Sequence, residues 1–352
     1  MPDKPIMTDN KTASILLLCT GGTISMSVDP GTGALTPFRF DQLQVQLPEL
    51  KKFNFSIDFV QFDPLLDSSE VGPAEWVRMA EIIDEAYDRY DGFVVLHGTD
   101  TMAYSASALS FLLQNLNKPV VLTGSQLPIG MVRTDGKENL ITAIEIAASK
   151  DHGLPIVPEV CIFFESTLWR GNRTTKKNAE LFNAFGSYNY PPLATAGVHI
   201  RYNRTVIHTA SNERELILHR LLDANIAILK LFPGISHGYV KAVFDTPGLR
   251  AVVLESFGAG NAPSVDWLIK ELEQAAAKGI VVVNITQCNT GSVEMGRYKT
   301  SVHLMDAGVI SGYDITTESA VTKLMFLLGH YQDVAIVRSE FSRSYCGEMT
   351  VE

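Results

Sequence analysis

The sequence predicts an α/β protein with two α/β domains: a larger N-terminal domain with a mainly parallel sheet flanked by helices, and a smaller C-terminal domain with a parallel sheet. Apolar runs typical of buried strands alternate with amphipathic stretches typical of helices, which is the pattern of parallel sheets. This alternation stops near residue 202 and resumes at residue 226. The 352 residues also exceed what one hydrophobic core commonly organises.

In the first half of the chain, apolar runs predict five strands, near residues 14–19, 57–62, 93–96, 119–123 and 159–164. Helices are predicted between these strands. Pro73 begins one that runs to about Asp88, because proline suits the first helical turn, and the other two are Ala103–Leu116 and Lys137–Lys150. The segment from Ala179 to Ile200 has no clear periodicity.

The second half repeats the alternation of strands and helices. Strands are predicted at Ile226–Leu231, Ala251–Leu254 and Ile280–Ile285, with helices at Val265–Lys278 and Glu318–Leu328. We therefore expect an N-terminal catalytic domain over residues 1–202, a linker over 203–225 and a C-terminal domain over 226–352.

Composition favours a cytoplasmic enzyme over a nucleic-acid or membrane protein. The formal net charge is -10 and no dense Lys/Arg tract is present, which argues against a nucleic-acid or anionic-membrane partner. The first apolar run, Ile15–Cys19, is too short for the core of a signal peptide, and no stretch approaches the roughly 20 residues that span a bilayer.

Three polar motifs each follow an apolar run: Thr20-Gly21-Gly22-Thr23, His97-Gly98-Thr99-Asp100-Thr101 and Thr174-Thr175-Lys176. The carboxyl ends of neighbouring parallel strands face one crevice, so these motifs can bring two threonines, an aspartate and a lysine together. A hydroxyl nucleophile needs a nearby base, and a desolvated lysine held between a hydroxyl and a carboxylate can serve. The motifs therefore predict a hydrolytic site.

Each motif has a simpler interpretation when it stands alone. The two glycines could form a phosphate-binding loop or only a tight turn, although no G-x-G-x-x-G motif and no Walker lysine accompanies them. Asp100 could cap the helix that follows, a role that Thr101 could fill equally well. Spacing does not choose between Lys176 and Lys177 as the base.

Together, the three motifs resemble those of the bacterial-type L-asparaginases. Four further segments agree in order: Asp67-Ser68-Ser69, Thr123-Gly124-Ser125-Gln126, Asp135-Gly136-Lys137-Glu138-Asn139-Leu140 and Gly258-Ala259-Gly260-Asn261-Ala262-Pro263. The resemblance runs from about Ser14 to Leu328. The run Arg170–Lys176 is similar to that of the cytoplasmic form of this family, which agrees with the absence of a signal peptide.

The resemblance implies hydrolysis of the side-chain amide of L-asparagine, with four catalytic residues: Thr23, Thr99, Asp100 and Lys176. In the family, the threonine matching Thr23 is usually taken as the nucleophile, and those matching Thr99, Lys176 and Asp100 form a proton relay. The substrate-binding residues are expected to be Gly22, Asp67, Ser68, Ser69, Gly98, Thr99, Asp100 and Ser125. Among them, Asp100 would bind the α-amino group, the Ser68 segment the α-carboxylate and Ser125 the amide carbonyl, with backbone amides at the glycine turns as oxyanion donors.

The resemblance also implies no metal, no organic cofactor and a homodimer or homotetramer whose partner contributes Gly258–Pro263 to the site. Some cytoplasmic members bind effector asparagine near the catalytic lysine, a neighbourhood where Thr175, Glu255 and Cys288 fall. One feature departs from the family: no tyrosine lies between Thr23 and Tyr87, where members carry a lid tyrosine. The matching segment, Pro30–Pro37, still has the Gly and Thr content of a mobile lid.

Other functions remain open from the sequence. A glutaminase-asparaginase would share all these motifs. The amidase subunit of a tRNA-dependent amidotransferase would share them too, but it normally has an extra N-terminal domain and only about thirteen residues precede the first strand. A protein that merely binds amino acids between two α/β domains would gain nothing from a Thr/Asp/Lys relay.

Overall fold

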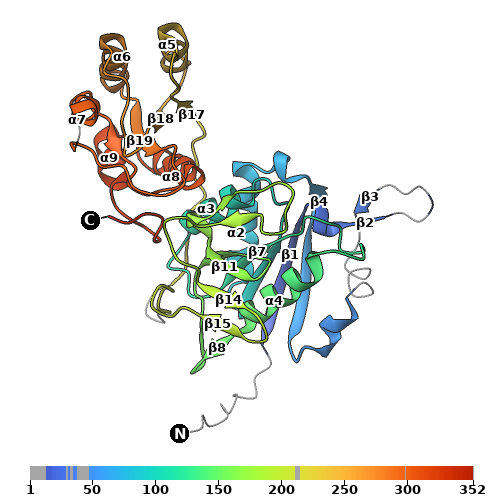
Figure 1. The fold of residues 1–352 in the computed structure, drawn as a ribbon. Helices are drawn as coiled ribbons and strands as arrows, with labels where there is room; N and C mark the ends of the chain where they lie inside the picture. The colour runs from blue at the N-terminus through green and yellow to red at the C-terminus, as the bar shows by residue number, and fades with distance from the viewer. Residues whose placement is uncertain are drawn as a thin grey trace.

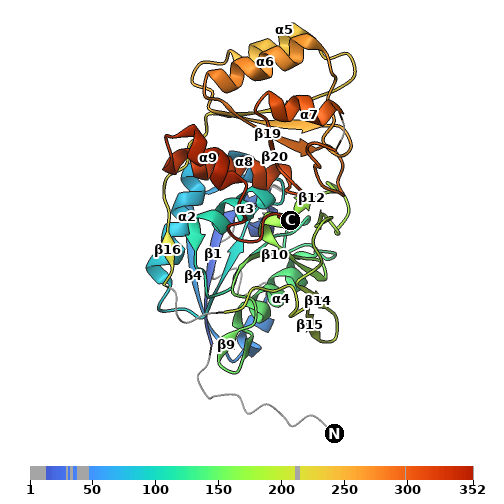
Figure 2. The same cartoon turned by 90° about the vertical axis from the view of Figure 1, so that its left-hand side faces the viewer.

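The computed structural model describes residues 13–28, 31, 35–37, 47–210, 215–297 and 299–351. These residues build an eight-stranded sheet and a separate four-stranded sheet, each covered by helices, besides several two-stranded ladders (Figure 1). We call the two parts the large-sheet unit and the small-sheet unit. They are stacked along the long axis of the molecule (Figure 2). The predicted fold class is confirmed.

The eight-stranded sheet has the order β15-β14-β11-β10-β7-β5-β1-β4. Its parallel strands are β1 (Ser14–Gly21), β4 (Ser56–Leu66), β5 (Gly92–Leu96), β7 (Val120–Thr123) and β10 (Val160–Phe164). All five were predicted. The remaining three run antiparallel at one edge: β11 (Thr167–Arg170), β14 (Ala194–Ala196) and β15 (Ile200–Tyr202). The sequence missed them because three or four residues carry too little alternation to be recognised.

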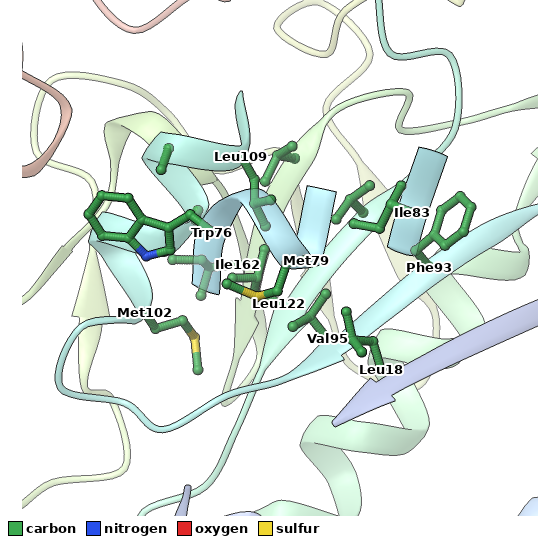
Figure 3. Close-up of a cluster of buried hydrophobic side chains, with 14 of the residues drawn as sticks. Leu18, Trp76, Met79, Ile83, Phe93, Val95, Met102, Leu109, Leu122 and Ile162 are labelled. Carbon is green, nitrogen blue, oxygen red and sulfur yellow. The ribbon is translucent and has the colours of Figure 1, made fainter. Parts of the chain in front are cut away.

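Two apolar layers sandwich the large sheet, because successive side chains of a strand point to opposite faces. Helices α2 (Pro73–Ala86) and α3 (Met102–Leu112) cover one face, where Trp76 packs near Val95 and Leu122 (Figure 3). Helix α4 (Gly136–Ala148) covers the other face, packing against Leu17 and Val94. Since the central strands β1, β5, β7 and β10 are buried on both faces, polar side chains that follow them reach solvent at the strand ends.

The small sheet is entirely parallel, in the order β17-β18-β19-β20. Its strands are Ile226–Lys230, Ala251–Ser256, Val281–Thr286 and Ile310–Ser311. Helices α5 (His237–Phe244), α6 (Asp266–Ala277) and α7 (Lys299–Asp306) pack on one face, and α8 (Thr317–His330) and α9 (Val334–Phe341) on the other. The first three strands, α6 and α8 match the predicted elements. The eight-residue helices α5, α7 and α9 are too short for a strong periodic signal.

Helices α3 and α8 join the two units, with the rings of Phe111 and Phe326 stacked 6.0 Å apart. Between the units, β16 (Ile217–Leu218) pairs with β6 (Leu113–Gln114), which directly follows α3. The domain boundaries at residues 202 and 226 stay a prediction.

Short elements complete the fold and carry most of the polar motifs. They are η1 (Thr23–Ser25), β2 (Met26–Val28), β3 (Leu35–Pro37), η2 (Pro48–Lys52), η3 (Ser68–Glu70), β8 (Lys150–Asp151), β9 (Leu154–Pro155), η4 (Gly171–Arg173), β12 (Thr175–Lys176) and β13 (Phe185–Gly186). In the predicted lid, residues 30 and 32–34 lie outside the described residues. Among the helices of the described part, none combines the length and apolar character that crossing a membrane requires.

Candidate active site

The polar motifs that follow β1, β4 and β5 meet through close backbone contacts. A Cβ atom on Gly22 would lie 2.4 Å from the Cα of Gly98, and one on Gly98 would lie 2.6 Å from the Oγ of Ser68. Side chains larger than hydrogen do not fit at such distances. Gly22 also has a φ of 81°, which glycine adopts without strain. Glycine at both positions therefore lets the turns holding Thr23, Thr99 and Ser68 lie against one another.

Lys176 reaches this junction from a separate part of the fold. It lies on β12, which follows η4, while Thr99 and Asp100 lie between β5 and α3. The Lys176 Nζ atom donates a hydrogen bond of 2.8 Å to Thr99 Oγ1 and lies 2.5 Å from Asp100 Oδ1. The predicted contact among these three residues is present in the structure.

The structure also distinguishes the two candidate lysines. Lys177 is exposed and its aliphatic chain runs beside Gly186, whereas Lys176 is half-buried against Thr99. The Lys176 side chain is 17% exposed and that of Asp100 is 67% exposed. Lys176 is thus shielded while a second cation can still approach Asp100.

The Asp67-Ser68-Ser69 segment forms the start of η3, and its own hydrogen bonds define its shape. The Asp67 carboxylate accepts hydrogen bonds from the backbone N of Ser69 at 2.9 Å and from its hydroxyl at 2.7 Å. Both bonds favour the ionised form and lower the pKa of Asp67. Ser68 is buried, directly beside Gly98.

Thr101 differs from the expectation that it could cap the helix after Asp100. It occupies the N-cap position of α3, but its hydroxyl donates a 2.6 Å hydrogen bond to the carbonyl oxygen of Ser68, and no side chain caps this helix. The contact with η3 orients the Thr101 hydroxyl towards Ser68, whereas a cap would have to accept from a free backbone N–H of α3. Thr101 therefore fastens the Ser68 segment to the start of α3.

A buried hydrogen-bond chain supports the Thr99 loop from below. The hydrogen-bond chain begins at Trp76, whose indole N–H donates to Ser105 Oγ at 2.9 Å. Ser105 Oγ in turn lies 2.8 Å from His97 Nε2. His97 Nδ1 lies 2.7 Å from the carbonyl oxygen of Gly98, so Nδ1 must carry the hydrogen and Nε2 must accept from Ser105. Complete burial lowers the pKa of His97 to about 4, which keeps the ring neutral.

Two family models match this chain and together cover most of it. The model described as "Asparaginase, N-terminal" matches residues 14–208, and that described as "Glutaminase/Asparaginase C-terminal domain" matches residues 225–341. The chain belongs to the asparaginase family. This confirms the resemblance inferred from the sequence motifs.

Individual relatives agree along nearly the whole chain. L-asparaginase 1 of Escherichia coli (strain K12) is 44% identical over 342 residues, which is 96% of this chain and 98% of that protein. The 60 kDa lysophospholipase of Mus musculus is 40% identical over 336 residues, 90% of this chain and 58% of the mouse protein. A crystal structure of L-asparaginase I from Vibrio cholerae O1 biovar eltor str. N16961 superposes with a TM-score of 0.88 at 40% identity, covering 97% of this chain and 100% of that one.

Within this asparaginase site, Ser125 and Gln126 take different positions. The buried Ser125 hydroxyl donates to the carbonyl oxygen of Leu127 at 2.5 Å, so it points into its own loop. Gln126 instead contacts Thr99, since its Oε1 atom accepts from Thr99 Oγ1 at 3.3 Å. The Asp135 carboxylate fixes the loop by accepting from the backbone N of Gln126 at 3.0 Å. Gln126 was missed as a site residue, although it belongs to a segment that matched the family.

Thr23 opens the short helix η1 immediately after Gly22 and is half-buried. Its hydroxyl makes no hydrogen bond to any residue that the structure describes. In the segment Pro30–Pro37, where the family resemblance leads us to expect a lid, residues 30 and 32–34 lie outside the described residues. Thr23 therefore stands at the junction of the motifs with its hydroxyl free of described partners.

The three residues named as an effector neighbourhood line one cavity of about 170 Å³ between the two units. Thr175 enters it from β12, and Glu255 and Cys288 from the ends of β18 and β19. The Thr175 hydroxyl donates to Glu318 Oε1 at 2.5 Å, and burial raises the pKa of Glu318. Lys230 also lines the cavity, and its Nζ atom lies 3.1 Å from the Glu255 carboxylate. The cavity therefore presents a cation and an anion beside Thr175, the residue that precedes Lys176.

Proposed function

We propose that this chain is an L-asparaginase that hydrolyses the side-chain amide of L-asparagine to L-aspartate and ammonia through a threonine nucleophile. The observation that supports this is the contact of Lys176 with both Thr99 and Asp100, beside the turn that carries Thr23. Membership of the asparaginase family supports the same activity.

In the proposed reaction, a threonine hydroxyl oxygen attacks the amide carbon and its proton passes to the relay. The tetrahedral oxyanion is stabilised by backbone amides at the glycine turns, a contribution of about 3 kcal/mol per donor in comparable sites. The C–N bond then breaks as the nitrogen takes up a proton and leaves as ammonia. Water hydrolyses the resulting ester to free aspartate and the threonine.

Thr23 is assigned the attack and Thr99 the relay. The Lys176 amine lies within hydrogen-bond distance of Thr99 Oγ1, so in its neutral form it can accept a proton from that hydroxyl. The neighbouring Asp100 carboxylate stabilises the ammonium that re-forms when Lys176 takes up the proton, because opposite charges favour the ionised pair.

Substrate binding follows from the same junction. The exposed Asp100 carboxylate can receive the α-ammonium of asparagine, and the Asp67-Ser68-Ser69 segment is proposed to hold its α-carboxylate. Ser125 is kept as the proposed contact for the amide carbonyl. Its hydroxyl would have to exchange the Leu127 carbonyl for the substrate when the site is occupied.

The proposed enzyme is cytoplasmic and works as a homodimer or homotetramer. The proposed assembly involves the turn at Gly258–Pro263, which follows β18 in the small-sheet unit. A 2.6 Å hydrogen bond from the Thr286 hydroxyl to the Gly258 carbonyl holds this turn. This turn is the proposed contribution of a neighbouring subunit. Light scattering on active enzyme at micromolar concentration tests the assembly, and a fully active monomer would exclude it.

The cavity lined by Thr175, Glu255 and Cys288 is proposed as a regulatory asparagine site. Lys230 and Glu255 offer a cation and an anion to the two charged groups of an amino acid. Velocity measured against asparagine concentration should then be sigmoidal. A hyperbolic curve for the wild-type protein and for Glu255→Gln alike would remove this proposal.

Variants of the relay test the catalytic assignment. Thr23→Ala, Thr99→Val and Lys176→Met should each lower kcat by about a hundredfold or more, because each removes a nucleophile or a proton carrier. Lys177→Met is the matched control, since Lys177 is exposed next to Lys176, and should keep wild-type turnover. Near-normal ammonia release by Lys176→Met would exclude the relay. Binding of asparagine without ammonia release by the wild type would instead indicate an amino-acid-binding protein.

A further inference from the structure

The strand that carries Lys176 has little support of its own. Strand β12 consists of Thr175 and Lys176 alone and, among the strands of the described residues, pairs only with the equally short β13. It follows the three-residue helix η4, which comes directly after β11. Such a segment needs anchors outside its own secondary structure to hold an amine within 2.8 Å of Thr99.

Arg173 provides such an anchor three residues before Lys176. Its side chain is 3% exposed, and its Nη1 atom forms an ion pair of 2.8 Å with Asp314 Oδ2, without the alignment of a hydrogen bond. The Nε atom donates to the carbonyl oxygen of Gly347 at 2.7 Å, and Nη2 donates to Thr350 Oγ1 at 3.1 Å. Arg173 therefore binds three groups of the small-sheet unit and of the segment after α9.

The segment Arg343–Thr350, which we call the strap, is itself firmly held. Lys323 on α8 forms a completely buried ion pair of 2.6 Å with Glu348. The Glu348 carboxylate also accepts from the backbone N of Tyr345 and of Cys346 at 3.0 and 2.9 Å. The strap is thus an extension of the small-sheet unit that reaches the large-sheet unit.

Further contacts connect the strap with Arg173 and its neighbour. The backbone N of Thr350 donates to Asp314 Oδ1 at 2.7 Å, which closes a ring of Arg173, Asp314 and Thr350. Asn172 Nδ2 donates to the carbonyl oxygen of Cys346 at 3.0 Å. On either side of η4, the Thr174 hydroxyl donates to the Arg170 carbonyl at 2.6 Å. The backbone between Arg173 and Lys176 therefore has little freedom to move independently of the strap.

We propose that Arg173 is a positioning residue for Lys176, and that the strap holds it in place through Gly347 and Thr350. This inference rests on the proposed role of Lys176 in the relay. Displacement of a reacting group by about 1 Å can lower turnover by about a hundredfold, so small movements of β12 suffice to weaken the Lys176–Thr99 contact. If the Arg173 contacts only joined the two units, losing them would lower the stability of the protein and leave the turnover of the folded enzyme unchanged.

Two variants separate these roles. Arg173→Lys keeps the positive charge but loses the planar fork, so it cannot serve Asp314, Gly347 and Thr350 together. We expect kcat to fall about tenfold while KM stays within about twofold, and the acid limb of the pH–rate profile to shift, because the surroundings of the Lys176 amine change. Thr350→Val removes one hydroxyl at constant shape and should lower kcat about threefold. Thr350 does not itself line the cavity at Cys288, whereas Arg173 does.

Arg250→Lys is the matched control. Arg250 is also a partly buried arginine, paired with Asp223 at 2.8 Å and donating to the Leu328 carbonyl at 2.8 Å and to the Tyr331 carbonyl at 3.1 Å. Among the described residues, none of these partners belongs to η4, β12 or the strap. It should lower the melting temperature and leave kcat and the pH–rate profile unchanged. If Arg173→Lys does not fold, the kcat of Thr350→Val still tests the proposed positioning role.

A double-mutant cycle with Lys176→Met completes the experiment. If Arg173 acts through Lys176, Arg173→Lys adds no further loss of kcat in the Lys176→Met background. Equal losses in both backgrounds, or wild-type kcat in both Arg173→Lys and Thr350→Val, would overturn the inference. Wild-type turnover of Lys176→Met alone would overturn the proposed relay instead, so the two failures are distinguishable.

Discussion

His97 should make the protein unstable in mild acid. Its folded-state pKa of about 4 lies below the ordinary 6.5, because charging the ring would require burying a cation. The unfolded chain therefore binds more protons than the folded one between these values, so stability is complete above pH 6.5 and falls as the pH drops towards 4. Between pH 7 and pH 5 this amounts to about 2 kcal/mol from His97 alone.

Urea unfolding followed by tryptophan fluorescence at pH 7 and pH 5 measures this loss. The wild type should lose about 2 kcal/mol more than His97→Gln, which has no ring to titrate. His199→Gln is the matched control, because His199 is exposed, and it should follow the wild type. Equal losses for the wild type and His97→Gln would show that the ring is not held neutral by burial.

Three further outcomes are expected. Gly98→Ala should lower kcat/KM about tenfold or more, because the new methyl group meets Ser68 Oγ at 2.6 Å, whereas Gly197→Ala, which has open space, should be neutral in the same assay. Lys323→Met should cost about 3–5 kcal/mol in urea unfolding by leaving Glu348 buried without its partner, and added Glu348→Gln should recover part of it; no loss would contradict the buried pair. Asparagine should exceed glutamine in kcat/KM by roughly 10–200-fold, since one extra methylene misplaces the amide, and equal values would indicate a glutaminase-asparaginase.

The sequence predicted the parallel strands and long helices because each has its own apolar periodicity. Strand β5 is an uninterrupted buried run, and α2 begins at Pro73 as expected. The antiparallel strands β11, β14 and β15 escaped prediction because their pairing partners, not their three or four residues, define them. The short helices α5, α7 and α9 escaped prediction because eight residues are too few for a clear helical periodicity.

The candidate site was predictable only in part. Strand order places the turns after β1 and β5 side by side, so the proximity of Thr23 and Thr99 follows from the fold class. The choice of Lys176 over Lys177 depends on the direction of β12, which spacing does not reveal. The hydroxyl of Thr101 could accept from a backbone N–H of α3 or donate to the Ser68 carbonyl, and the packing of η3 against α3 brings that carbonyl within reach.

The contact of Arg173 with the strap also has a consequence for how the enzyme matures. Arg173 and Gly347 are 174 positions apart in the chain, and they belong to parts of the fold built around different sheets. Contacts between residues so distant form late, after each sheet has assembled. A protein refolding from denaturant should therefore recover its circular-dichroism signal before it releases ammonia, with the docking of two finished halves as the step that switches activity on.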